Sequence, residues 1–264
     1  MTAAAALIAA ALPSPAPASP ASNEEQAQLN ERYLKLNMAA NAALLTWGLF
    51  MWDYGENAPH ANSEWWFGLD TKHGGADKTG HVYVAYLFGR GSAELYMDWG
   101  FGREEAALRG LLTSLTLTTV MEVGDSFSDY GLSPQDLIAN AVGMGFGYLL
   151  TIYPSAGKFV DLRVEYLPKG VDNDPTTDYE HMKHLAAFKL SGFDALKGSW
   201  LRFVEFHLGY YTRNFSGPSK GDEERNIYAG IGINLSELFA PTGYGGIFRY
   251  LQLPYTYLAA DDCR

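Results

Sequence analysis

The sequence predicts an α+β protein, with a bundle of about four apolar helices (residues 33–153) followed by an antiparallel sheet of four to six strands. Two observations support this fold class. Apolar residues recur every three or four positions up to Tyr153, which is typical of helices. After Pro154 they recur every second position, which is typical of strands with one buried face. Three regions follow: a leader (1–22), a helical core (23–155) and a β region packed on the helices (156–264).

The predicted helices have clear start and stop signals. Residues 33–52 are strongly apolar and form either a buried helix or a marginal membrane span, and the polar stretch 23–32 can begin this helix. Further helices are expected over 77–99 and 104–123. The fourth helix opens at Ser133-Pro134 and stops before Pro154, since Ser is a good N-cap and Pro suits the first helical position. Gly143 and Gly147 on it let another helix approach closely.

The strands are predicted from period-two patterns. Residues 160–166 alternate apolar side chains with Asp161, Arg163 and Glu165, and similar patterns occupy 200–211 and 226–238. The segments 185–192 and 247–258 add two more candidate strands. His181 and His184 lie three apart in a polar turn, so we expect a solvated pair rather than metal ligands.

Charge and cysteine content exclude several functions. The net charge of -11 and the absence of a basic stripe argue against a nucleic-acid partner and against charge-driven docking on anionic lipid. The single cysteine, Cys263, excludes an internal disulfide and a multi-thiolate zinc site.

The leader indicates a compartment. Residues 1–22 carry no charge, and Ala3 to Leu12 form an apolar run of the length of a signal-peptide core, followed by a Pro/Ala/Ser segment. The basic residues that normally precede such a core are missing, so a disordered tail is the alternative. A signal peptide would place the mature protein in the periplasm or outer membrane of a Gram-negative-type cell.

Three polar pairs interrupt the apolar helices, and we expect them to meet at one end of the bundle. The pairs are Asp77 with His81, Glu122 with Asp125, and Asp136 with Asn140. Their spacings of three or four residues place both members of a pair on one helix face.

These residues suggest two kinds of chemistry. His81 is the candidate general base, Asp77 would orient it, and Lys78 would hold an anionic part of a substrate. The candidate cofactor is one divalent cation, whose ligands would be the oxygen atoms of Glu122, Asp125, Asp136 and Asn140. Each residue also has a structural interpretation: helix caps at Asp77 and Ser133, and packing roles for His81 and Asn140.

The same stretches resemble a known family. They are "DKTGHVYVAY" (77–86), "EVGDSFSDYGLSPQDLIANAVGMGFG" (122–147), "LGYYTRN" and "RNIYAGIGINLSEL", over roughly residues 45–250. They are similar to the YfiM-like family of predicted periplasmic lipoproteins, an uncharacterised bacterial family, and more distantly to VanZ-like membrane proteins. The characteristic positions of the YfiM-like family correspond in this sequence to Asp77, Lys78, His81, Glu122, Asp125, Ser133, Asp136, Asn140 and Gly143.

The resemblance implies an envelope location and no established reaction. The chain departs from the family in two places. It has no lipoprotein cysteine after the leader, and Ser126 stands where a glycine is expected.

Two functions are compatible with these patterns. The first is an envelope protein that binds or processes a lipid or cell-wall glycan head group at the His/Asp/Glu site, by hydrolysis or transfer if it is an enzyme. The alternative is a non-catalytic structural or assembly subunit of an outer-membrane-associated complex. Expected partners are therefore a membrane or envelope lipid, or other proteins of an envelope complex. An open pocket at the polar residues favours the first function, and a closed hydrogen-bonded network favours the second.

Overall fold

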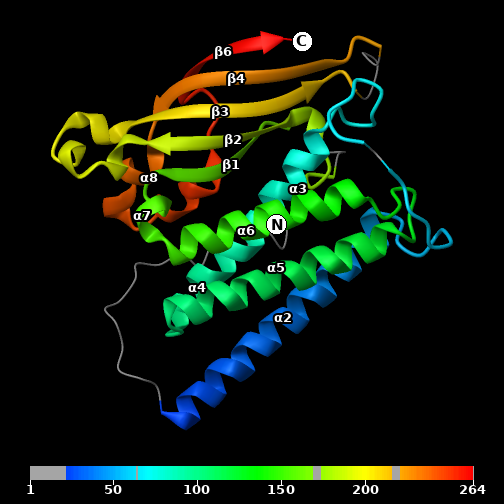
Figure 1. Ribbon diagram of the computed structural model, residues 1–264, viewed down its shortest axis with the longest axis horizontal. Coiled ribbons are helices and arrows are strands. Elements are labelled where there is room, and N and C mark those ends of the chain that lie inside the picture. Colours follow the sequence, from blue (N-terminus) through cyan, green and yellow to red (C-terminus); the bar gives the residue numbers. More distant parts are fainter. Residues whose placement is uncertain (1–21, 64, 169–173, 216–220, 264) are drawn as a thin grey trace. The chain divides into compact units, whose positions relative to one another are not determined.

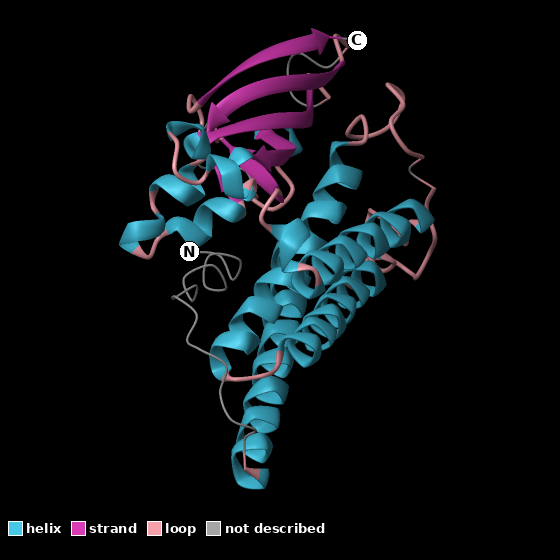
Figure 2. Cartoon of the chain, turned by 60° about the vertical axis from the view of Figure 1, so that its left-hand side comes forward, coloured by secondary structure: helices cyan, strands magenta, loops and turns pink. Residues whose placement is uncertain are grey.

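The computed structural model describes residues 22–63, 65–168, 174–215 and 221–263, and the leader lies outside them except for Ser22. The fold is α+β as predicted, with helices up to Ile152 and a six-stranded sheet after them (Figures 1 and 2). The chain forms two compact units. The first contains residues 1–63 and 84–152, and the second contains residues 64–83 and 153–264.

Helix α2 (Asn23–Met51) begins at a capping box. The Ser22 side chain accepts a hydrogen bond from the Glu25 backbone N–H, and the Glu25 carboxylate accepts one from the Ser22 backbone N–H. The polar stretch 23–32 therefore belongs to the same helix as the apolar stretch after it. Gly48 is the buried residue of α2, and Leu34, Met38 and Phe50 are exposed, so α2 is not the fully buried helix of the first interpretation.

The predicted second helix is built of three consecutive segments. They are α3 (Ala76–Tyr86), the π-helical segment η1 (Leu87–Gly91) and α4 (Ser92–Trp99). The last segment ends at Gly100, whose φ of 114° is in the left-handed region that glycine adopts without a steric penalty. The predicted helix is thus confirmed, with a π turn in its middle that the sequence pattern does not indicate.

Helices α5 (Arg103–Asp125) and α6 (Pro134–Ile152) complete the first unit. Within this unit α5 packs against α2, α4, η1 and α6. Ser133 caps α6, because its hydroxyl accepts a hydrogen bond from the Asp136 backbone N–H at 3.3 Å. Gly147 of α6 allows close packing as predicted: a Cβ atom there would lie 3.2 Å from the Tyr86 carbonyl oxygen and 3.3 Å from the Arg90 nitrogen.

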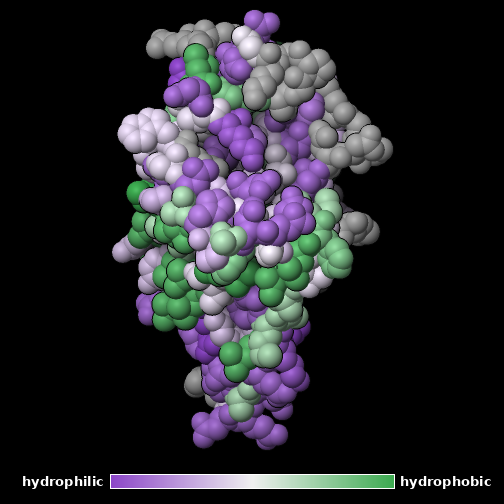
Figure 3. All heavy atoms as spheres, turned by 90° about the vertical axis from the view of Figure 1, so that its right-hand side faces the viewer, coloured by the Kyte–Doolittle hydropathy of each residue, from purple (hydrophilic) through white to green (hydrophobic). Residues whose placement is uncertain are grey.

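The interior of the first unit is unusually polar. Its buried side chains include Thr113, Ser114, Thr118, Glu122, Asp136 and Asn140, whereas exposed positions of the same helices carry Leu108, Leu112, Leu115, Ile138 and Val142. Figure 3 shows hydrophobic residues gathered in a band on one face of the surface. Among the described residues, no helix combines the length and apolarity needed to cross a membrane.

The sheet of the second unit has the strand order β5-β1-β2-β3-β4-β6. Its strands are β1 (Val160–Tyr166), β2 (Met182–Lys189), β3 (Val204–Arg213), β4 (Glu224–Ile233), β5 (Leu251–Gln252) and β6 (Tyr257–Cys263). The sheet is antiparallel as predicted except for one pair, because the short β5 pairs in parallel with β1. The remaining pairs are antiparallel.

The charged face of the sheet is buried and the apolar face is exposed, which is the reverse of the expected arrangement. Asp161, Arg163 and Glu205 are fully buried, whereas Phe206 and Leu208 on the opposite face are 47% and 53% exposed. The period-two pattern correctly separates the two faces, but the charged face is the one inside. A period of two specifies that the faces differ and not which of them is covered.

Short helices connect the strands of the second unit. They are α7 (Pro154–Gly157), α8 (Leu235–Leu238) and the 3₁₀ turns Tyr179–His181, Leu190–Gly192, Asp194–Leu196, Trp200–Phe203, Ala240–Thr242 and Gly245–Arg249. The predicted packing of the sheet region on the helices stays a prediction.

Candidate functional site

A buried carboxylate–amide pair joins α5 to α6. Asn140 Nδ2 donates a hydrogen bond to Glu122 Oε1 at 2.8 Å, and both residues are 2% exposed. Asp136 lies one turn before Asn140 on the same helix and is 6% exposed. Since α-helical residues four apart share a face, the capped N-terminus of α6 presents Asp136 and Asn140 on one row.

Helix α3 is held against these two helices at its C-terminal end. Ser114 Oγ of α5 donates a hydrogen bond to the Ala85 carbonyl oxygen at 2.8 Å, and Gly147 of α6 lets the Tyr86 carbonyl approach. His81 precedes Ala85 by one turn of the same unbroken helix. Residues four apart on an α-helix share a face, so His81 and Ala85 lie on the same side of α3.

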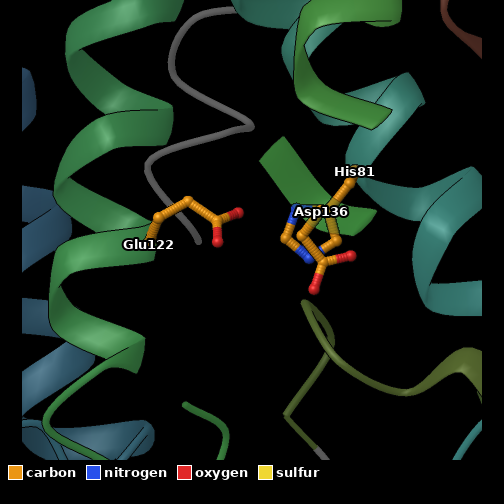
Figure 4. Close-up of side chains that lie close together, drawn as sticks. All are labelled: His81, Glu122 and Asp136. Atoms are coloured by element: carbon orange, nitrogen blue, oxygen red, sulfur yellow. The ribbon is translucent and has the colours of Figure 1, made fainter. Parts of the chain in front are cut away.

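The side chains of His81, Glu122 and Asp136 converge (Figure 4). One possible ligand atom from each residue, an imidazole nitrogen and two carboxylate oxygens, lies within 4.8 Å of the other two. Glu122 and Asp136 are buried, and His81 is partly buried. The three residues come from three helices, α3, α5 and α6.

The donor set matches the coordination chemistry of a divalent metal ion. Imidazole nitrogen and carboxylate oxygen bind Zn²⁺ at about 2.0–2.2 Å, so two ligands of one ion lie at most about 4.4 Å apart. The limit of 4.8 Å is close to this value, so a small side-chain movement closes the cluster around an ion. Such a set also suits Mn²⁺, which accepts both ligand types.

Asp125, a predicted metal ligand, lies beside another partner. Burial and the neighbouring Asp125 carboxylate raise the pKa of Tyr54, whose hydroxyl donates a hydrogen bond to the Met121 carbonyl oxygen at 3.1 Å. The Tyr54 ring packs against Gly48 of α2 and Gly124 of α5, where a Cβ atom would lie 2.1 Å from the ring. Asp125 therefore has a packing partner outside the His81 cluster, and its role as a ligand stays a prediction.

Asp77 and Lys78, the other two predicted catalytic residues, form an ion pair. Lys78 Nζ lies 2.7 Å from Asp77 Oδ2, and the two residues are 2% and 7% exposed. The sequence suggested that Asp77 orients His81 and that Lys78 holds a substrate anion. Both roles stay predictions, and the ion pair gives each residue a structural function as well.

The sequence did not single out Arg90. This residue is 5% exposed and lies in the π-helical segment η1, where its Nη1 donates to the Tyr86 hydroxyl at 2.6 Å and its Nε lies 3.3 Å from Glu94 Oε1. Single π turns within α-helices are frequent at functional sites. The available signal was a lone arginine between two glycines, "GRG", in an otherwise apolar helix.

The buried charges of the sheet were also missed. Arg163 makes a bidentate contact with Glu205 at 2.5 and 2.8 Å, and His207 Nε2 lies 2.8 Å from Glu205 Oε1. Lys189 Nζ contacts Asp161 Oδ2 at 2.5 Å. The alternation of these residues with apolar ones was visible, but it indicated a solvent-facing row.

The expected solvated histidine pair is half wrong. His181 is partly buried and contacts Asp178 at 2.7 Å, but His184 is buried on β2 and contacts Thr79 Oγ1 at 2.9 Å. Burial lowers the pKa of His184 to about 4. The turn ends at His181 and β2 begins at Met182, so His184 already belongs to the sheet.

The fold is α+β, and the side chains of His81, Glu122 and Asp136 form a histidine–carboxylate cluster. Residues 63–152 match the model of a family described as predicted periplasmic lipoprotein (DUF2279). This segment contains α3, η1, α4, α5 and α6, and therefore His81, Glu122, Asp136 and Asn140. Searches of curated proteins and of solved structures gave no match.

The family match confirms the recognised resemblance over this segment. It also agrees with the predicted location in the cell envelope, because the family is described as periplasmic. The signal peptide, the outer membrane and the likeness to VanZ-like proteins stay predictions.

Proposed function

We propose that this protein binds one divalent cation at His81, Glu122 and Asp136, and through it the head group of an envelope lipid or cell-wall glycan. The convergence of these three side chains carries the proposal. Three protein ligands leave coordination positions open for water or a substrate oxygen, as in catalytic metal sites. Asn140 supports the site by its hydrogen bond to Glu122, which fixes the orientation of that carboxylate.

The reaction class that follows from such a site is hydrolysis or group transfer at the head group. A bound divalent ion polarises a phosphoryl or carbonyl oxygen and makes its water acidic enough to attack near neutral pH. The periplasmic family description supports a substrate of the cell envelope. Lipid and glycan head groups carry the oxygen atoms that such an ion binds.

The test is a cation titration of the full-length protein after treatment with a chelator. Isothermal titration calorimetry with Zn²⁺, and separately with Mn²⁺, should show one ion per chain. His81→Asn, Glu122→Gln and Asp136→Asn should each weaken the affinity at least tenfold. At a free ion concentration of about 100 Kd, binding should stabilise the wild type by about 2.7 kcal/mol in thermal melts.

Glu104→Gln is the matched control, because Glu104 is an exposed carboxylate in the first turn of α5. It should leave cation affinity unchanged. A wild type that binds neither ion, or a control that loses affinity as much as Glu122→Gln, would contradict the proposal.

A second candidate is the non-catalytic structural or assembly subunit of an outer-membrane-associated complex. The buried Glu122–Asn140 hydrogen bond favours it, because a satisfied polar pair between two helices can serve only to fix their packing. In that case the chain binds no cation, and removing the Glu122 carboxylate lowers stability instead. The titration and the thermal melts of the same variants therefore separate the two functions.

A further inference from the structure

The second unit contains a cavity of about 600 Å³, within the range of small-molecule binding sites. One row of its floor is formed by Leu162, Ala186 and Leu208, which lie side by side on β1, β2 and β3. The next row contains His184 and Ile227. This is the apolar face of the sheet, opposite the buried charges.

The other wall comes from the first turns of α3 and the loop before it. Phe67, Val82 and Tyr83 line the cavity there. The Phe67 ring meets the Tyr210 ring edge-on, with the centroids 5.3 Å apart, and the Tyr83 ring lies 5.8 Å from the His184 ring. Aromatic and aliphatic side chains thus enclose the space from both sides.

Apart from Arg163 and Arg225, the polar side chains in the lining are neutral and already hydrogen-bonded. Thr79 Oγ1 lies 2.9 Å from His184 Nδ1, and the Tyr210 hydroxyl donates to the Gly74 carbonyl. Burial lowers the pKa of His184 to about 4 and raises the pKa of Tyr210 to about 12, so both are uncharged at neutral pH. These groups have little left to offer a polar ligand, which favours an apolar one.

Arg225 provides a positive charge at this apolar site. Its Nη1 donates to the Phe67 carbonyl, while its Nε is buried and has no hydrogen-bond partner among the described residues. Arg163 also lines the cavity, but its guanidinium is engaged by Glu205 on the opposite face of the sheet. A buried donor without an acceptor is costly, and an anionic group beside Arg225 would satisfy it.

We infer that this cavity binds a fatty acid, with its chain on the apolar floor and its carboxylate at Arg225. Leu208 and Ile227 are 53% and 57% exposed, so the floor continues to the surface and gives the chain a way in. Burial of a long alkyl chain supplies most of the binding free energy, and the charge pair fixes the direction of the chain. The inference rests on the second unit alone and does not depend on the proposed cation site.

Palmitate, titrated into the full-length protein below its micelle concentration, tests the inference by calorimetry. One palmitate per chain should bind. Ala186→Phe places a ring in the cavity and should weaken binding at least tenfold. Ala229→Phe is the matched control: Ala229 pairs with Leu208 on the same sheet face but does not line the cavity, so this change should leave the affinity unaltered.

Arg225→Gln provides a second measurement that does not alter the cavity floor. It should weaken palmitate binding about tenfold and leave the affinity for the uncharged analogue hexadecanol unchanged. The inference is overturned if palmitate does not bind, if both phenylalanine variants bind it equally well, or if hexadecyl phosphate binds more tightly than palmitate.

Discussion

The sheet and the helices both bury charged side chains, but they combine them differently. In the sheet, Asp161 and Glu205 face Lys189 and Arg163, so that acids and bases alternate in direct contact. In the helices, two carboxylates and an imidazole come within 4.8 Å of one another. The first arrangement is typical of a structural network, in which each buried charge is paired with an opposite one. The second arrangement is typical of the ligands of a metal ion. The comparison shows that the kinds of buried groups identify a candidate site better than burial alone.

The largest effect on the free energy of unfolding is expected from breaking the buried charge network of the sheet. Arg163→Met leaves Glu205 buried without its bidentate partner and should cost about 3–5 kcal/mol of unfolding free energy. The double variant Arg163→Met/Glu205→Leu should recover much of this loss, because no unpaired charge remains at that contact. Urea unfolding measures both.

The control for this prediction is the exposed pair Lys35–Glu31 on α2, whose side chains are 74% and 64% exposed. Lys35→Met should change stability by less than about 1 kcal/mol. If Arg163→Met were equally mild, the buried network would not be the structural element that we describe.

The second prediction concerns pH. His184 has a folded-state pKa of about 4, below its ordinary value of 6.5, so the unfolded chain binds more protons between these pH values. Stability should therefore be complete above about pH 6.5 and fall by about 3 kcal/mol as the pH decreases to about 4. Thermal melts of His184→Asn should lose this part of the pH dependence. Exposed His60→Asn should keep it.

The sequence predicted much of the fold from local signals. Ser133-Pro134 begins α6 as expected, and the apolar period places α5 within two residues of its ends. It could not show that β5 joins β1, because a two-residue strand has no pattern of its own. Nor could it show which sheet face is inside, since that depends on the segments that cover the face.

For the candidate site, spacing alone placed pairs of residues on helix faces. It singled out His81, Glu122 and Asp136, whose possible ligand atoms lie within 4.8 Å of one another, and it grouped Asp125 with them, which lies beside Tyr54; their roles as ligands stay predictions. Two side chains that are three residues apart on a helix differ by about 60° in direction. This difference is enough for one of them to face a different neighbour. The burial of Arg163 and His184 was missed because a polar residue on a strand looks the same in the sequence whether or not a partner element covers it.

The third prediction tests how tightly the polar helices pack. A Cβ atom on Gly110 of α5 would lie 2.3 Å from the Gly89 carbonyl oxygen, a backbone atom that cannot turn away. Gly110→Ala should therefore destabilise the protein by about 1–3 kcal/mol in thermal or urea unfolding. Gly145→Ala on α6 meets no atom within 4 Å and should be neutral or slightly stabilising. Equal effects of the two changes would contradict the close packing of η1 on α5.

The smallest effect is expected at the candidate site. Glu122→Gln keeps an oxygen that can accept the hydrogen bond from Asn140, so the metal-free protein should lose no more than about 1 kcal/mol. The same change should abolish stabilisation by added Zn²⁺. A loss of 3 kcal/mol or more without metal would place the cluster with the sheet network, as a structural element.

The π turn at Leu87–Gly91 sets how far the preceding helix α3 is rotated about its axis relative to α4. A π turn is equivalent to one extra residue in an α-helix, and each residue turns the helix by about 100°. A single-residue deletion there that restored regular α geometry would swing the preceding turns of α3 by roughly that angle. His81 would then move away from Glu122 and Asp136 although none of these three residues had been substituted. The direction of the His81 side chain therefore depends on the number of residues in the π turn. Changing that number is as damaging to the site as losing a side chain.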